Sequence, residues 1–209
     1  MEWLDFFIGP YKQALPLHIA LEITAIIASL VSVYYSFNNN VLVFPFGILS
    51  TMIYVYLLVQ WNLLGDMLIN GYYFIMSIYG WYLWSHVSNG KKLLPVTKTT
   101  KTDWQVTAII IPAGALAVYS VYTISGRLEQ WVSYVDMLTT GIFFAGMWLM
   151  ARRKLEYWLV LLVGNVISVP LYTYKGYGFS AVLYLILAII AYFGYIEWKK
   201  YVNNAPQVV

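Results

Sequence analysis

The sequence predicts an all-α integral membrane protein whose seven transmembrane helices form two parallel three-helix repeats joined by a linker helix (3+1+3). First, hydrophobic residues make up 61% of the 209 residues and charged residues only 10%, whereas soluble domains carry about a quarter charged residues. Second, the chain divides into seven apolar stretches of about 20 residues, the length that crosses a bilayer as a helix. Third, the sequence resembles itself at an offset of 114 residues.

Three spans make up the first half of the chain. They are expected at residues 17–36, 41–60 and 66–87. The N-terminal segment before them is acidic and lacks the basic start of a secretory signal, so no cleaved targeting segment is expected. Three consecutive asparagines, 38–40, form a turn signal between the first two spans. The longest polar loop follows the third span and continues through Asp103.

Four spans make up the second half. The fourth, 105–123, contains Pro112 and the small residues 113–115, which would allow close contact with another helix. The others are expected at 134–151, 157–174 and 179–198, separated by the basic run 152–154 and by the turn 175–178. The single membrane domain, 1–209, is therefore divided into repeats at 17–88 and 134–198 and a linker helix at 105–124.

The repeat rests on pairs of residues at the same offset. Glu22 matches Asp136, Gly80 matches Gly194, and Trp84 matches Trp198, with no gap across three spans. The two copies have the same orientation because the fourth span restores the chain direction. Parallel repeats joined in this way are a transporter architecture, with the substrate site near the midplane between the halves.

Basic residues are divided unequally between the two sides of the predicted bundle. The side of the N-terminus holds Lys12, Arg127 and Lys175, and the other side holds Lys91, Lys92, Lys98, Lys101, Arg152, Arg153, Lys154, Lys199 and Lys200. Basic loops stay in the cytoplasm. We therefore expect a multi-pass protein of the cytoplasmic membrane, with the N-terminus outside and the C-terminus in the cytoplasm.

Composition and motifs exclude several classes of function. The net charge is only +3 and scattered, which gives no indication of nucleic acid binding. The chain has no cysteine and only two histidines, so neither a metal site nor a cofactor is expected. It also lacks the HExxH, GxSG and GxGD motifs, so we predict that it is not an enzyme.

A polar stripe runs along the third span. Asp66, Asn70, Tyr73 and Ser77 recur at steps of three and four, so they share one face of a helix. In the sixth span, Asn165, Ser168 and Tyr172 do the same. An unpaired amide in hydrocarbon costs several kcal/mol. Each asparagine must therefore bond a neighbouring helix or a ligand, and the sequence leaves both options open.

The chemistry of these stripes indicates a class of cargo. No lysine or arginine falls well inside any span, whereas a phosphorylated ligand needs such a cationic side chain to pair with its phosphate. The preferred cargo is therefore neutral or cationic, polyhydroxylated, and flat enough to stack on tryptophan or tyrosine.

Several of these residues also have structural interpretations. Asp66 is equally well placed to cap the third span. Trp81, Trp84 and Trp198 are expected to belong to the aromatic belt at the membrane surface. Glu22 and Asp136 are read as structural carboxylates near the outer ends of their spans, although a proton relay stays open.

The chain also resembles a known family. Trp61, Gly65, Asn70, Tyr72, Tyr73, the run 79–82 and Trp84 in the third span, with Asn165, Ser168, Pro170 and Tyr172 in the sixth, look like the PnuC family of bacterial vitamin transporters. The resemblance implies a fold related to the SWEET sugar transporters. It also implies facilitated diffusion of nicotinamide riboside, which a cytoplasmic kinase traps by phosphorylation. Related members carry riboflavin or thiamine, and the sequence does not exclude those cargoes or a proton-coupled symporter.

The polar stripes and the resemblance together give a hypothesis for the substrate site. It comprises Gln60, Trp61, Asn70, Tyr73, Ser77, Asn165, Ser168, Tyr172 and Tyr184. The two bundles are expected to rock about this site to give alternating access. Besides the lipid bilayer, the expected partners are the vitamin substrate and, through its product, the kinase; a homo-oligomer is left open. The remaining alternative, a structural membrane subunit, would not need polar stripes in both repeats.

Overall fold

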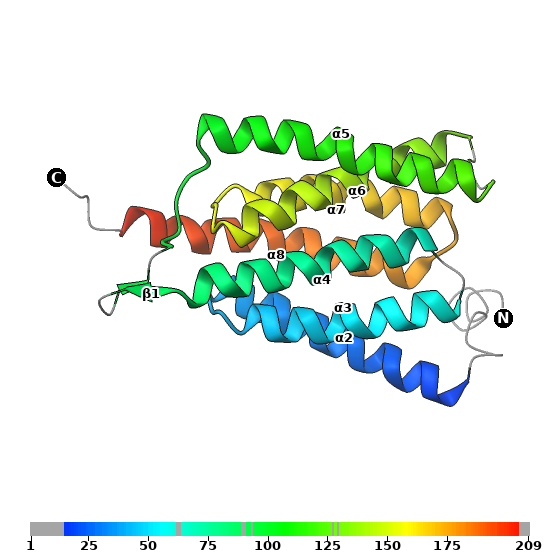
Figure 1. The fold of residues 1–209 in the computed structure, drawn as a ribbon, viewed down its shortest axis with the longest axis horizontal. Helices are drawn as coiled ribbons and strands as arrows, with labels where there is room; N and C mark the ends of the chain where they lie inside the picture. The colour runs from blue at the N-terminus through cyan, green and yellow to red at the C-terminus, as the bar shows by residue number, and fades with distance from the viewer. Residues whose placement is uncertain are drawn as a thin grey trace.

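The computed structural model describes residues 15–61, 64–88, 91–92, 94–126, 128 and 130–204. Within them the chain forms seven α-helices and one short hairpin (Figure 1). The helices are α2 (Pro16–Phe37), α3 (Val43–Gln60), α4 (Leu64–Ser85), α5 (Lys101–Ile124), α6 (Gln130–Ala151), α7 (Tyr157–Tyr174) and α8 (Gly178–Asn203). The antiparallel hairpin pairs β1 (Val87–Ser88) with β2 (Lys91–Lys92).

The predicted all-α fold class is confirmed. Six of these helices are long and apolar enough to cross a membrane, and α4 is not among them. The helix carries Asp66, Asn70 and four tyrosines, which are less apolar than the aliphatic residues that dominate a lipid-facing helix. The helix that departs from the apolar pattern is therefore the one expected to line a cavity.

Three helices are longer than their apolar stretches. α5 begins at Lys101, four residues before the predicted span, because Thr100 and Asp103 form a capping box there. α6 begins at Gln130 rather than 134, and α8 continues to Asn203 rather than 198. The difference has a simple cause: hydropathy marks the part of a helix that suits lipid, whereas backbone hydrogen bonding continues into water.

The helices of the two halves start at the same offset that the sequence shows. The first residues of α2 and α6 (16 and 130), α3 and α7 (43 and 157), and α4 and α8 (64 and 178) are each 114 apart. The same offset joins Asn39 and Arg153, which have positive φ angles of 51° and 53° in the turns that follow α2 and α6.

Matching glycines bring the helices of each half together. A Cβ atom on Gly80 of α4 would lie 2.3 Å from the Phe44 ring of α3, and one on Gly194 of α8 would lie 2.6 Å from the Trp158 ring of α7. Side chains larger than hydrogen do not fit at either place. Each half therefore packs a large aromatic ring of its second helix against a glycine of its third.

The linker helix α5 packs on α6, at one side of the bundle (Figure 1). A Cβ atom on Gly114 would lie 3.0 Å from Gly141 Cα, and one on Gly141 would lie 2.2 Å from the Ile111 carbonyl oxygen. The small residues of the linker thus allow the close helix contact that the sequence predicts.

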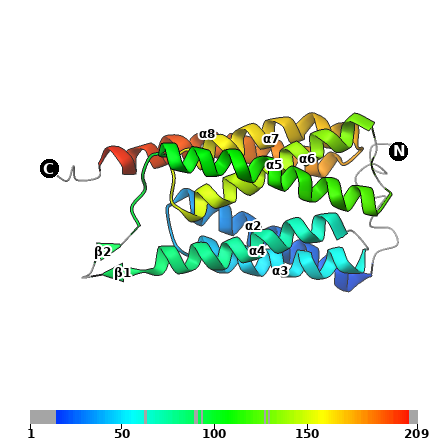
Figure 2. The same cartoon turned by 45° about the horizontal axis from the view of Figure 1, so that its top comes forward.

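Seven helix termini gather at the end of the bundle where the hairpin lies (Figure 2). We call it the basic end because the described residues Lys98, Lys101, Arg152, Arg153, Lys154, Lys199 and Lys200 belong to it. Lys12 and Arg127, which the sequence assigns to the opposite side, lie outside the described residues.

The prediction that Trp84 and Trp198 belong to the membrane-surface belt is wrong. Trp84 is 2% exposed and Trp198 is fully buried, with their ring centroids 5.8 Å apart. Trp84 Nε1 donates to the Ala151 carbonyl 3.1 Å away, and Trp198 Nε1 donates to the Ser36 carbonyl 2.9 Å away. Each indole thus bonds a helix of the other half, which removes it from the surface. Trp81, in contrast, is exposed, as a belt residue would be.

Candidate functional site

Two cavities lie between the two halves of the bundle. Their volumes are about 260 and 310 Å³. All six helices of the two repeats contribute to each lining, whereas no described residue of α5 does. The linker helix therefore connects the halves without forming the walls.

The first cavity, which we call the Asp66 cavity, is lined by carboxylates and tyrosines. Its polar and aromatic lining residues are Ser29, Tyr54, Asp66, Asn70, Tyr73, Asp136, Thr139, Thr140, Phe143, Ser168, Tyr172 and Tyr184. Among the described lining residues, two side chains are acidic and none is a lysine or arginine. The lining therefore suits a cation or a neutral polar ligand.

The second cavity, which we call the Asn165 cavity, lies toward the basic end. Its polar lining residues are Ser29, Ser32, Ser36, Ser50, Thr51, Tyr73, Ser77, Tyr157, Asn165 and Tyr184, and Phe44 and Trp158 add aromatic faces. The Ser36 and Tyr157 hydroxyls share a hydrogen bond of 2.7 Å that joins α2 to α7. In the part of the chain that the structure describes, this lining also has no lysine or arginine.

Aromatic rings separate the two cavities. Tyr73, Phe143 and Tyr184 line both. The Phe143 and Tyr184 rings are stacked, with centroids 5.9 Å apart and planes 17° apart, and the Tyr172 ring lies 4.8 Å from Tyr184. A flat ligand passing between the cavities would meet these faces.

Seven of the nine predicted site residues line the cavities. Asn70, Tyr73, Ser168, Tyr172 and Tyr184 line the Asp66 cavity, while Ser77 and Asn165 line the Asn165 cavity together with Tyr73 and Tyr184. Whether these seven bind the substrate stays a prediction.

Gln60 and Trp61 line neither cavity. They end α3 at the opposite end from the basic residues, and both are exposed. The Trp61 ring meets the His18 ring edge-on, with centroids 6.3 Å apart. The structure thus does not bring these two residues to the other seven: Tyr54 is the last described residue of α3 in a cavity wall, and Gln60 and Trp61 lie six and seven residues further along, at the exposed end of the helix.

The buried polar groups of the stripes are satisfied unequally. Asn70 Nδ2 donates to the Asp66 carbonyl at 2.9 Å, one turn earlier, so its amide is held by its own helix rather than by another. Ser168 is fully buried, and its Oγ has no hydrogen-bond partner among the described residues. Asn165 is 4% exposed. Ser168 therefore offers an unused hydrogen-bonding group at the wall of the Asp66 cavity.

Sequence reasoning missed the contribution of α6. Asp136, Thr139, Thr140 and Phe143 line the Asp66 cavity from this helix. Their spacing of three, four and seven residues was a readable signal for one helix face. It was obscured because threonines, aspartate and phenylalanine differ in chemistry, and because both threonine hydroxyls donate back to the Asp136 carbonyl, at 3.0 and 2.8 Å.

Asp136 takes part in a network at the end of the Asp66 cavity. Its Oδ2 lies 2.9 Å from Lys175 Nζ and accepts a hydrogen bond from the Tyr122 hydroxyl. Lys175 Nζ also lies 5.1 Å from the centroid of the Tyr172 ring. The carboxylate thus contacts the linker helix and the α7–α8 turn, which favours the structural interpretation of Asp136 without removing it from the cavity wall.

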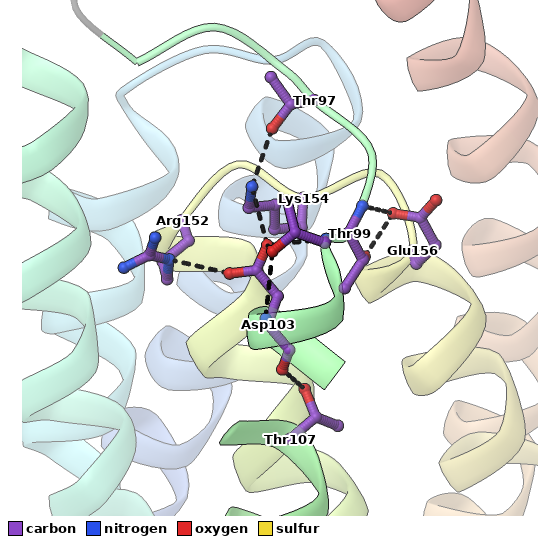
Figure 3. A network of polar contacts seen from close by, with 8 residues as sticks. Thr97, Thr99, Asp103, Thr107, Arg152, Lys154 and Glu156 are labelled. Atoms are coloured by element: carbon purple, nitrogen blue, oxygen red, sulfur yellow. Dashed lines mark hydrogen bonds and ion pairs between the residues drawn. The ribbon is translucent and has the colours of Figure 1, made fainter. Parts of the chain in front are cut away.

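A second polar network holds the basic end (Figure 3). Asp103, the acidic member of the capping box in the first turn of α5, lies 3.0 Å from Lys154 Nζ and 3.5 Å from Arg152 Nε. Lys154 Nζ also donates to Thr97 Oγ1 at 3.1 Å, and Glu156 accepts from the Thr99 backbone at 2.6 Å. These contacts tie the start of the linker helix to the α6–α7 turn.

Arg153 joins both halves beside this network. It is 2% exposed, its Nη1 donates to the Leu94 carbonyl at 2.7 Å, and its Nη2 donates to the Asn39 carbonyl at 3.3 Å. The guanidinium carbon lies 4.1 Å over the Trp84 ring. Burial lowers the pKa of Arg153 to about 10, so it is charged at neutral pH and the aromatic face and carbonyls offset its desolvation.

Comparisons with known proteins agree on one family. A family model described as nicotinamide mononucleotide transporter matches residues 19–200. The nicotinamide riboside transporters PnuC of Escherichia coli (strain K12) and Shigella flexneri are each 22% identical over 213 aligned residues, covering 90% of this chain and 87% of theirs. The riboflavin/roseoflavin transporter RibM of Streptomyces davaonensis is 24% identical and covers 59% of this chain and 58% of its own.

A solved structure shares the fold. The crystal structure of the vitamin B3 transporter PnuC superposes with a TM-score of 0.66 at 19% identity, covering 88% of this chain and 82% of that one. The likeness extends over nearly the whole bundle.

Proposed function

Since the chain belongs to the nicotinamide mononucleotide transporter family, we propose that it takes up nicotinamide riboside by facilitated diffusion. The resemblance to the PnuC family seen in the sequence is confirmed. The family consists of multi-pass membrane transporters of vitamin precursors and not of enzymes. The choice among the precursors, and the mechanism, rest on the cavities.

The observation that supports the riboside is that the described lining residues of the two cavities include no lysine or arginine, while Lys175 at the end of the Asp66 cavity is already paired with Asp136. The family description names a mononucleotide, whereas the curated relatives PnuC are named for the riboside. A phosphate would need arginine or lysine to pair with its charge, and neither occurs among the described residues that line the two cavities. The riboside instead offers a pyridinium ring, an amide and ribose hydroxyls. These match the carboxylates, tyrosine faces, Asn165 and Ser168.

The two cavities suggest the path of transport. We place the basic end in the cytoplasm by the positive-inside rule, so the Asp66 cavity receives substrate from outside and the Asn165 cavity releases it inward. The rings of Phe143 and Tyr184 between them must part as the two bundles rock. A cytoplasmic kinase then phosphorylates the riboside, and the Asn165 cavity, with no lysine or arginine among its described lining residues, disfavours return of the phosphate.

A thermal stability panel tests this function. The detergent-purified protein is melted with nicotinamide riboside, its 5′-phosphate, riboflavin or thiamine, because a bound ligand raises the melting temperature by mass action. We expect a shift with the riboside and none with the phosphate. A shift with the phosphate at equal concentration would contradict the argument from the linings.

The same panel resolves the alternative cargo. RibM covers only part of the chain, yet it keeps riboflavin as a second candidate, and a shift with riboflavin alone would select it. Coupling is tested separately in liposomes: facilitated diffusion predicts uptake that continues unchanged when the proton gradient is collapsed, and a loss of uptake would instead favour a proton symporter.

A further inference from the structure

At the end of the Asp66 cavity, the ammonium group of Lys175 pairs with a carboxylate and lies near the face of an aromatic ring. Lys175 Nζ lies 2.9 Å from Asp136 Oδ2 and 5.1 Å from the centre of the Tyr172 ring. Asp136 and Tyr172 both belong to the cavity wall, while Lys175 does not. The Lys175 and Asp136 side chains are 21% and 15% exposed, so the pair is partly removed from water.

This combination of groups is one that proteins use to bind organic cations. A carboxylate supplies the opposite charge, and an aromatic face adds a cation–π attraction that grows as water is excluded. Tyr184 extends the aromatic surface, since its ring lies 4.8 Å from that of Tyr172. The Lys175 ammonium therefore stands where a cationic ring entering the cavity would be most stable.

The position of Lys175 allows its ammonium to leave. The residue caps the C-terminus of α7 in a turn whose next residue, Gly176, has a φ of 80°. Four methylenes separate the charge from the backbone, so the ammonium can swing into water without moving α7 or α8. Asp136, in contrast, is fixed on α6 and is also held by the Tyr122 hydroxyl.

We propose that Lys175 is an internal competitor for the substrate cation and thereby weakens the binding of charged rings in the Asp66 cavity while leaving that of uncharged rings unchanged. A cationic ring that displaces the ammonium leaves Asp136 paired with a positive charge. An uncharged ring of the same shape gains no charge pairing from the carboxylate, so it binds beside the ion pair and leaves the ammonium on Asp136, where displacement would strand a partly desolvated carboxylate. This inference rests on the proposed function, because it assumes a cationic substrate.

A purely structural role for Lys175 makes a different prediction. If the ion pair only fastened the α7–α8 turn to α6, its loss would lower stability and would change the binding of charged and uncharged ligands by the same factor. The ratio of the affinities for the charged and the uncharged ligand therefore distinguishes competition from a purely structural role.

The experiment measures this ratio by calorimetric titration of the detergent-purified full-length protein. The probes are nicotinamide riboside and its uncharged 1,4-dihydro form, which have nearly the same shape. For Lys175→Met we expect about tenfold tighter binding of the cation and little change for the uncharged form. Lys175→Arg, which keeps a competing cation, should resemble the wild type.

Asp136→Asn is the second, independent arm. It removes the charge that both cations share, so we expect about tenfold weaker binding of the riboside and affinities for the two probes that become nearly equal. Lys200→Met is the matched control, since Lys200 pairs with Glu197 at the basic end. Melting temperatures without ligand show that each variant is folded.

Two results would overturn the inference. One is a Lys175→Met protein in which both probes change by the same factor, or in which the cation binds more weakly. The other is an Asp136→Asn protein that keeps its preference for the cation, and this arm decides the matter if Lys175→Met does not fold. If the wild-type protein binds the riboside but the variants do not show the expected affinities, the proposed function stands and only the inference about Lys175 is wrong. If the wild-type protein binds riboflavin but neither nicotinamide riboside nor thiamine, the proposed function and this inference are both wrong.

Discussion

At the scale of single residues, the substrate wall is a set of short polar groups placed on helix faces. Asn70 and Tyr73 on α4 line the same cavity as Ser168 and Tyr172 on α7. Within each pair the spacing predicts a shared helix face, because residues three or four apart lie on the same side of a helix. Partners across the bundle are not encoded by spacing. Asn70 is held by its own helix, whereas the Oγ of Ser168 is left without a partner.

The first prediction concerns Asn165, which is nearly buried in the wall of the cavity nearer the basic end. We expect Asn165→Ala to weaken nicotinamide riboside binding by about 5- to 150-fold, since losing a hydrogen bond from a buried ligand group costs about 1–3 kcal/mol. Calorimetric titration measures it. Gln60→Ala is the control: Gln60 lines neither cavity, and a loss of affinity there would mean that the site extends to the end of α3.

At the scale of helices, each repeat is built around a glycine on its third helix. The matching contacts of Gly80 with Phe44 and Gly194 with Trp158 set how closely α4 lies to α3 and α8 to α7. They thereby fix the positions of the stripe on α4 and of Tyr184 on α8. Close packing of this kind leaves no room for even one methyl group.

The second prediction is therefore a stability difference within one helix. Gly80→Ala should destabilise the protein by about 1–3 kcal/mol because the added Cβ overlaps the Phe44 ring. Gly71→Ala, in the same helix, meets nothing within 4 Å and should be neutral or stabilising by up to about 1 kcal/mol. Thermal melting in detergent checks both. Equal melting temperatures for the two variants would refute the packing argument.

At the scale of the whole molecule, the two halves are joined most firmly at the basic end. Trp84 and Trp198 each donate a hydrogen bond to a carbonyl of the other half. Arg153 connects the α6–α7 turn to the Asn39 carbonyl of the first half. In this arrangement, any rocking that opens the basic end has to separate these contacts.

The third prediction follows from the crossed indole bonds. Trp84→Phe and Trp198→Phe keep an aromatic ring but remove the donor, leaving a buried carbonyl less satisfied at a cost of about 1–3 kcal/mol. We expect both variants to shift the population toward states open at the basic end. The chain has no cysteine, so one introduced at Met147, in the wall of the Asn165 cavity, reports opening by its labelling rate with a polar thiol reagent.

The expected result is labelling several-fold faster in the phenylalanine variants than in the parent. A cysteine at Ile69, in the wall of the Asp66 cavity, is the matched probe and should not become faster. Faster labelling at both positions would indicate general loosening rather than opening at one end.

The sequence by itself determined the membrane environment, the seven helices, the offset of 114 residues and the two polar stripes. These follow from hydropathy, helical periodicity and chain direction, which are local properties. The division into repeats at 17–88 and 134–198 stays a prediction, although the helix starts coincide at the same offset.

The tertiary structure alone decided which residues meet across the bundle. It buried Trp84 and Trp198, left Gln60 and Trp61 outside the cavities, and added Asp136 and Phe143 to the wall. It also set Lys175 against Asp136 and Tyr172. The physical reason is that a helical pattern fixes which residues share a face, whereas the neighbour of that face depends on how close the helices approach and on how the ends of the chain turn.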